Sequence, residues 1–279
     1  MKPVNFDYVR PSVVSEVIEF LQDDEHLVKL MAGGQSLGPM LNMRLVQPDI
    51  LVDLTGVAEL RSLNNRNNEI AIGACITHAD IEDGRVPDVT LGALRCVAGG
   101  IAYRAVRNRG TIGGSLTHAD PSADWVSMMA AVGASVTLRG PSGDRTIPVE
   151  NYMLGALEAD LRPGELLVSV NVPKLSSNAR WGYYKSCRKT GEFAHAIGAF
   201  MVDPDRKVCR AVIGATESRP LVFGDAQHIL GSYNDRALIA AFNRNAADAA
   251  LRDSGMEDLL DRQTHIAALR RAVEQARPI

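Results

Sequence analysis

Apolar residues follow two different rhythms along the first part of the chain. Residues 13–22 repeat apolar positions at the three- and four-residue spacing of an amphipathic helix, and Ser12 just before them suits a helix N-cap. Two short apolar runs, 27–32 and 49–54, are bounded by Gly, Pro and Asp, which predicts strands. The glycine-rich stretch AGGQSLGP, which begins at Ala32, therefore connects two predicted strands.

The pattern from residue 69 onward changes between strand and helix. EIAIGA at 69–74 and ELLVSVNVP at 165–173 predict strands, and SVTLRGPSGDRTIPV predicts a hairpin with its tip at GPSGD. Thr77 with Asp80 resembles a capping box that opens a short helix, and residues 123–132 favour another helix. THAD occurs twice, and we attribute the coincidence to helix-start chemistry rather than to duplication.

A break in the hydrophobic periodicity predicts a domain boundary at PKLSSNAR, residues 173–180, where proline, serine and asparagine interrupt the apolar pattern. Three β-rich runs follow, 181–187, 194–202 and 207–215, and their short connections suit an antiparallel meander. From Asp225 onward the pattern is helical, in the runs DAQHIL, ALIAAFNRNAADAAL and HIAALRRAVEQA. Strands followed by helices are typical of an α+β domain.

Composition narrows the class of protein. The 279 residues are 46% hydrophobic, enough for a self-sufficient core, and 30 basic against 33 acidic residues argue against a general nucleic-acid surface. No run of 18 apolar residues and no signal-peptide core occur, so we expect no membrane span and a cytoplasmic location. The four cysteines fall in separate segments without a CxxC pair, which predicts reduced core thiols and no metal site.

Two glycine segments carry the candidate chemistry: AGGQSLGP and, from residue 107, RNRGTIGGSLTHADPSADW. Paired glycines followed by Ser or Thr can direct successive N–H groups at an anion such as a pyrophosphate, whereas the alternative is two tight turns. Neither segment is GxGxxG or a P-loop. Charge-assisted hydrogen bonds of about 1.5–3 kcal/mol each barely offset an association cost of about 4–15 kcal/mol, so a tightly held ligand also needs a flat apolar part.

Three stretches, AGGQSLGPMLNMRL, RNRGTIGGSLTHADPSAD and YYKSCRKTGEFA, resemble the FAD-binding medium subunit of the molybdenum hydroxylases, the group that includes carbon monoxide dehydrogenase and xanthine dehydrogenase. The resemblance implies an α+β fold. A two-part FAD-binding domain of the vanillyl-alcohol-oxidase (PCMH) type would span 1–175, with a small lobe at 1–55 and a larger lobe at 56–175. A smaller α+β domain at 176–279 would carry a three-stranded antiparallel sheet and a helical bundle.

The resemblance also implies a set of FAD-binding residues. The first segment and residues 111–115 would wrap the pyrophosphate and ribityl chain, Asp124 would bind a hydroxyl, Lys185 would lie near the isoalloxazine, and Leu166 or Leu167 would offer main-chain contact. From the residues alone, Asp124 could instead be a helix N-terminal acid and Lys185 an exposed strand lysine. The family commonly has Asn at the position of Ser115, and the serine side chain has a shorter reach than asparagine. The full set is Ala32, Gly33, Gly34, Gln35, Ser36, Leu37, Thr111, Gly113, Gly114, Ser115, Ala119, Asp124, Leu166, Leu167 and Lys185.

By the same resemblance the chain carries FAD alone and passes electrons from 2Fe-2S clusters to a terminal acceptor, which stays open among NAD, oxygen, a quinone and a cytochrome. The expected partners are an iron-sulfur small subunit and a molybdopterin large subunit, assembled as a dimer of heterotrimers. Two rival functions are a self-contained flavin oxidoreductase and a non-catalytic scaffold subunit. No nucleophile or acid-base triad is found in the sequence.

Overall fold

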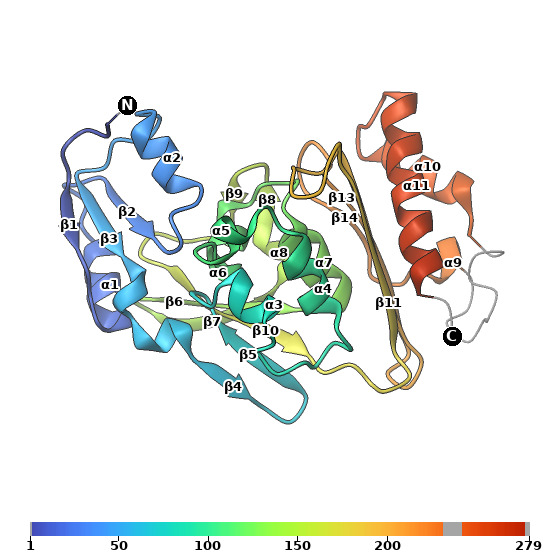
Figure 1. The fold of residues 1–279 in the computed structure, drawn as a ribbon, viewed down its shortest axis with the longest axis horizontal. Helices are drawn as coiled ribbons and strands as arrows, with labels where there is room; N and C mark the ends of the chain where they lie inside the picture. The colour runs from blue at the N-terminus through green and yellow to red at the C-terminus, as the bar shows by residue number, and fades with distance from the viewer. Residues whose placement is uncertain (1, 231–241, 277–279) are drawn as a thin grey trace.

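The N-terminal part is a small parallel sheet with two helices. The computed structural model describes residues 2–230 and 242–276. Strand β3 (Ile50–Asp53) lies between β1 (Asp7–Val9) and β2 (Val28–Met31), at one end of the molecule with α1 (Val14–Leu21) and α2 (Leu37–Asn42) (Figure 1). The run between β2 and β3 is therefore part loop and part helix, where the sequence predicted a loop alone.

The start of α1 differs from the prediction. The N-cap residue is Val13, and no side chain caps the helix. The N–H of Ser12 donates to the Glu16 carboxylate at 2.8 Å, so Ser12 contributes its main chain and not its hydroxyl. The predicted Ser N-cap is wrong, although the helix itself is confirmed.

A five-stranded antiparallel sheet forms the middle of the molecule, in the order β4-β5-β10-β6-β7 (Figure 1). Central strand β10 lies between β5 and β6 and is buried at most positions, as its nearly continuous apolar run requires. The predicted hairpin and both predicted strands are present. The bounds are β4 (Leu63–Asn65), β5 (Glu69–Gly73), β6 (Ser135–Gly140), β7 (Gly143–Pro148) and β10 (Leu166–Pro173).

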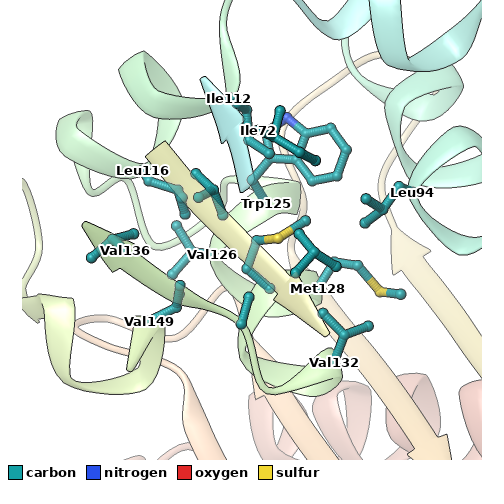
Figure 2. Packing of buried hydrophobic residues seen from close by; sticks show 14 of the residues in the cluster. Ile72, Leu94, Ile112, Leu116, Trp125, Val126, Met128, Val132, Val136 and Val149 are labelled. Atoms are coloured by element: carbon teal, nitrogen blue, oxygen red, sulfur yellow. The ribbon is translucent and has the colours of Figure 1, made fainter. Parts of the chain in front are cut away.

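Short helices cover this sheet and close the main core. Trp125 is fully buried at the centre of a cluster that also includes Ile72, Leu116 and Met128 (Figure 2). The capping box of Thr77 and Asp80 is confirmed. The remaining elements are η1 (Leu54–Gly56), η2 (Ala58–Arg61), α3 (His78–Glu82), α4 (Ala93–Gly100), α5 (Arg104–Arg107), α6 (Ile112–His118), α7 (Asp124–Val132), α8 (Val149–Tyr152), β8 (Met153–Gly155) and β9 (Glu158–Ala159).

A second antiparallel sheet, β11-β12-β13-β14, separates the helices of the central part from the C-terminal helices (Figure 1). Helix α7 packs on one face and α11 on the other, which explains why every residue of β12 is buried. The three predicted strands are present, and a short fourth strand after Pro220 extends the sheet beyond the expected three. The bounds are β11 (Arg180–Ser186), β12 (Ala196–Asp203), β13 (Val208–Gly214) and β14 (Leu221–Phe223).

The C-terminal helices are α9 (Gln227–Leu230), α10 (Arg244–Asp253) and α11 (Leu259–Gln275). Part of the predicted helical run ALIAAFNRNAADAAL, residues 237–241, lies outside the described residues. Close packing of α11 depends on glycine, because a Cβ added at Gly182 would lie 1.8 Å from the Ala272 carbonyl oxygen.

The cysteines are all free thiols, but only two of the four belong to the core. Burial raises the pKa of Cys75 to about 12 and that of Cys209 to about 11. Cys96 is exposed and Cys187 is half-buried, so the prediction of core thiols is wrong for these two.

Candidate functional site: a cavity between two glycine segments

A cavity of about 520 Å³ opens where the two glycine segments meet. This volume lies within the usual range for small-molecule sites. Thirteen of the fifteen residues in the predicted set line it: Ala32, Gly33, Gly34, Gln35, Ser36, Leu37, Thr111, Gly113, Gly114, Ser115, Asp124, Leu166 and Leu167. Ala119 and Lys185 are not among the lining residues.

Glycine allows the two segments to touch. A Cβ added at Gly33 would lie 2.1 Å from the carbonyl oxygen of Arg109 and 2.8 Å from Cα of Gly110. Both atoms belong to the main chain, so a side chain at residue 33 would force the segments apart. Gly113 is equally confined, since its added Cβ would lie 2.5 Å from the Ala74 Cβ.

The first segment presents open main-chain donors. In the described part of the chain, the N–H groups of residues 33–36 have no hydrogen-bond partner, and all four residues line the cavity. Gly34 has a φ of +69°, a conformation that glycine adopts without strain. The Gln35 side chain braces the turn by donating to the Gly33 carbonyl at 3.1 Å. Such a run of donors is suited to a phosphate or another anion.

The second segment differs because the N–H groups of residues 112–115 are already paired. These residues form the first turn of α6, with Thr111 as N-cap. The N–H of Ile112 donates to Ile76 at 3.0 Å, that of Gly113 to Ala74 at 2.9 Å, that of Gly114 to Thr111 Oγ1 at 3.1 Å and that of Ser115 to the Thr111 carbonyl at 3.0 Å. Residues 112–115 therefore offer the cavity a close surface rather than open amides.

A buried charged pair lies at the far end of the second segment. Asp124 begins α7 and is 9% exposed. Its carboxylate accepts from the Tyr183 hydroxyl at 2.7 Å and pairs with Lys185 Nζ at 2.9 Å, while Nζ also donates to the Gly100 carbonyl at 2.9 Å. Burial raises the pKa of Asp124, against the opposing effect of the Lys185 ammonium. Burial also raises the pKa of Tyr183, with Asp124 acting in the same direction.

Lys185 is held by protein groups next to the cavity. Its ammonium pairs with Asp124 and donates to the Gly100 carbonyl, and its predicted place near a flavin ring stays a prediction. Ala119 is fully buried at a φ of +52°, and its carbonyl accepts the N–H of Leu157 at 2.8 Å. Only Asp124 of the charged pair faces the cavity.

A family model described as the FAD binding domain in molybdopterin dehydrogenase matches residues 4–175. The chain belongs to the FAD-binding medium subunits of the molybdenum hydroxylase family. It is therefore the FAD-binding part of an oxidoreductase. The position of the domain boundary near residue 175 stays a prediction.

Relatives agree with this placement. The chain is 34% identical over 255 residues to the carbon monoxide dehydrogenase medium chain of Hydrogenophaga pseudoflava, covering 90% of this chain and 88% of that one. It is 37% identical over 207 residues to the 6-hydroxypseudooxynicotine dehydrogenase complex subunit alpha of Paenarthrobacter nicotinovorans, covering 74% and 70%.

Solved structures extend the likeness to the whole chain. Carbon monoxide dehydrogenase from Hydrogenophaga pseudoflava matches with a TM-score of 0.85 at 30% identity, over 99% of this chain and 98% of that one. Quinoline 2-oxidoreductase from Pseudomonas putida 86 matches with a TM-score of 0.85 at 32% identity and the same coverage.

Two further features of this medium subunit concern metals and membranes. Among residues 2–230 and 242–276, no group of three or more His, Cys, Asp or Glu could hold a metal ion. The helices in those ranges are all too short or too polar to cross a membrane.

Sequence reasoning missed other parts of the cavity wall, and two of them are informative. His78 lies in the first THAD, which we treated only as a helix start, and it lines the cavity from beneath Gly110. Residues 191–193, in the connection between β11 and β12, also reach the cavity and end in Phe193, which is 73% exposed. The glycine at position 191 is the only sign of the second part in the sequence. In the structure Gly191 has a φ of +91°, and a Cβ added there would lie 2.9 Å from the Ala102 carbonyl oxygen.

Proposed function

We propose that this chain carries FAD for electron transfer inside a heteromeric molybdenum hydroxylase, passing electrons from 2Fe-2S clusters of a partner subunit to a terminal acceptor. The observation that carries the proposal is the run of four unpaired N–H groups at residues 33–36 on the wall of a 520 Å³ cavity. A dinucleotide needs both features, since its diphosphate requires donors and its rings require an enclosed apolar volume.

We assign the residues of this site to different portions of FAD. The amides of 33–36 bind the diphosphate, and Gly34 turns them toward it. Asp124 accepts hydroxyl hydrogens, because a carboxylate has lone pairs beyond those used by Tyr183 and Lys185. The start of β10 at Leu166 and Leu167 lines the ring end. When bound, the flavin exchanges electrons with both one-electron and two-electron carriers.

Lys185 acts through Asp124 in this assignment. Its ammonium lowers the pKa of the Asp124 carboxyl against the larger opposite effect of burial, and so favours the charged form that accepts hydrogen bonds. The same ion pair joins α7 to β11 and therefore fixes the central part of the molecule against the second sheet.

Other subunits supply the remaining chemistry in this proposal. The relatives are called a medium chain and a complex subunit, which supports association with further chains. We propose an iron-sulfur small subunit and a molybdopterin large subunit, assembled as a dimer of heterotrimers in the cytoplasm.

The proposal is tested by anaerobic reduction of the flavin, followed by its absorbance. The isolated chain with FAD should not be reduced by a hydroxylase substrate, because it lacks a route for the electrons. In the complex with both partner subunits, the same substrate should reduce the flavin at least as fast as the complex turns over. Direct turnover of a small substrate by the isolated chain would show a self-contained oxidoreductase, and a complex that functions without flavin would show a scaffold.

A further inference from the structure

His78 is held in one orientation by a buried partner. Its side chain is 5% exposed, and the Trp125 indole N–H donates to its Nδ1 at 3.0 Å. An indole nitrogen can only donate, so Nδ1 must be the acceptor. In the neutral ring the hydrogen is then on Nε2. Burial lowers the pKa of His78 to about 4, with the nearby Arg107 acting in the same direction, so the ring is neutral near pH 7.

The Nε2 atom has no hydrogen-bond partner in the described part of the chain. It lies beneath Gly110, where an added Cβ would be 2.8 Å from it. Gly110 in turn lies against Gly33, whose added Cβ would be 2.8 Å from Cα of Gly110. His78, Gly110 and Gly33 all line the cavity. A donor without a partner therefore lies at the crossing of the two glycine segments.

The Nε2–H is available to an acceptor on a ligand in the cavity, because no protein group in the described part of the chain accepts it and His78 lines the cavity. The unpaired amides of residues 33–36 belong to residues that line the same cavity. Phosphate oxygens accept such donors, and a neutral histidine N–H can join the amides without adding charge.

We propose that His78 is an FAD-binding residue whose Nε2–H donates to a diphosphate oxygen of the cofactor, and that Trp125 is the positioning residue that directs this hydrogen into the cavity. The inference rests on the proposed placement of the diphosphate at residues 33–36.

Titration of FAD into the flavin-stripped complex of the full chain with its partner subunits tests the proposal. His78→Phe keeps a ring but removes the donor, and we expect FAD binding to weaken on the order of 3- to 10-fold, the factor that one neutral hydrogen bond supports. His26→Phe is the matched control, because His26 lies at the surface with Asp23 as partner. Binding by His78→Phe within twofold of that control would overturn the proposal.

Trp125→Phe separates positioning from binding. The donor stays in place but its tautomer is no longer set, so FAD binding should weaken by a smaller factor of about 2 to 3. Trp125→Phe weakening FAD binding more than His78→Phe would contradict the positioning role.

A tautomer measurement keeps the test independent of how well the variants fold. Long-range proton–nitrogen NMR of the wild-type chain labelled at histidine should show His78 with hydrogen on Nε2, and this nitrogen should shift when FAD is added. Hydrogen on Nδ1, or an Nε2 signal unchanged by bound FAD, would overturn the inference. If FAD binds but Gly33→Ala leaves its affinity unchanged, the placement of the diphosphate fails instead.

Discussion

The two glycine segments look alike in sequence and do different work in the structure. Each pairs two glycines directly after an apolar residue and reaches a serine within the next two positions. The N–H groups of 33–36 are unpaired, whereas those of residues 112–115 are all satisfied by neighbouring carbonyls and by Thr111. Gly113 of the second segment serves close packing, whereas in the first segment Gly33 lets the two segments touch and Gly34 forms the open turn. Similar residue patterns thus do not imply similar roles until each donor is followed to its acceptor.

Gly33→Ala should have the largest effect on FAD binding, because the added Cβ would lie 2.1 Å from the Arg109 carbonyl oxygen. Separating the segments removes several charge-assisted hydrogen bonds of about 1.5–3 kcal/mol each, so FAD binding should weaken at least ~100-fold. Gly38→Ala is the control, since an added Cβ there meets nothing within 4 Å. Equilibrium dialysis measures the FAD affinity of both variants. Equal affinities would mean that FAD binding does not need the contact between the two segments.

In the second segment, the ion pair between Asp124 and Lys185 should contribute to the stability of the fold. Lys185→Met leaves a buried carboxylate without its counter-ion, which should destabilise the fold by about 3–5 kcal/mol in urea unfolding. The double variant Asp124→Asn with Lys185→Met should recover most of this loss, because no unpaired charge remains. A single variant as stable as the wild type would show that the pair is not coupled to folding.

His78 makes stability depend on pH. Its folded pKa of about 4 lies below the unfolded value of 6.5, so the unfolded state gains a proton first as pH falls. The stabilising effect is therefore complete above about pH 6.5 and is lost toward pH 4, by about 3 kcal/mol in total. His78→Phe should lack this part of the dependence, which unfolding at several pH values would show. Parallel curves for the two proteins would contradict a neutral buried ring.

Thr111→Val should have the smallest effect. Losing the N-cap oxygen frees the Gly114 N–H and should cost about 1 kcal/mol of stability. FAD binding should change less than threefold, because this amide already has a partner in the protein. If Thr111→Val weakened FAD binding as much as Gly33→Ala, the two segments would be equivalent after all.

The elements were largely predictable because apolar periodicity and turn residues determine them locally. The hairpin after α7, the capping box at Thr77 and the three long strands of the second sheet all appear where the pattern placed them. β14 was missed because three residues carry too little pattern. Ser12 was misjudged because its main chain, not its hydroxyl, engages Glu16.

The cavity-lining residues were named largely from the family resemblance, but their bonding was not predictable from sequence. Whether an amide is open depends on carbonyls far along the chain, as with Ile112 and Ile76. The pairing of Lys185 with Asp124 joins residues 61 apart and follows from how the second sheet packs. Nothing in the sequence indicated that His78 belongs to the site, because its contacts with Trp125 and Gly110 depend on the tertiary fold.

Amide-resolved hydrogen exchange of the complex, with and without FAD, tests most directly whether the first segment's amides hold the diphosphate. The amides of residues 33–36 should exchange rapidly in the stripped protein and slow markedly with FAD, while those of 112–115 should be slow in both states. Protection by FAD at 112–115 with no change at 33–36 would contradict the account.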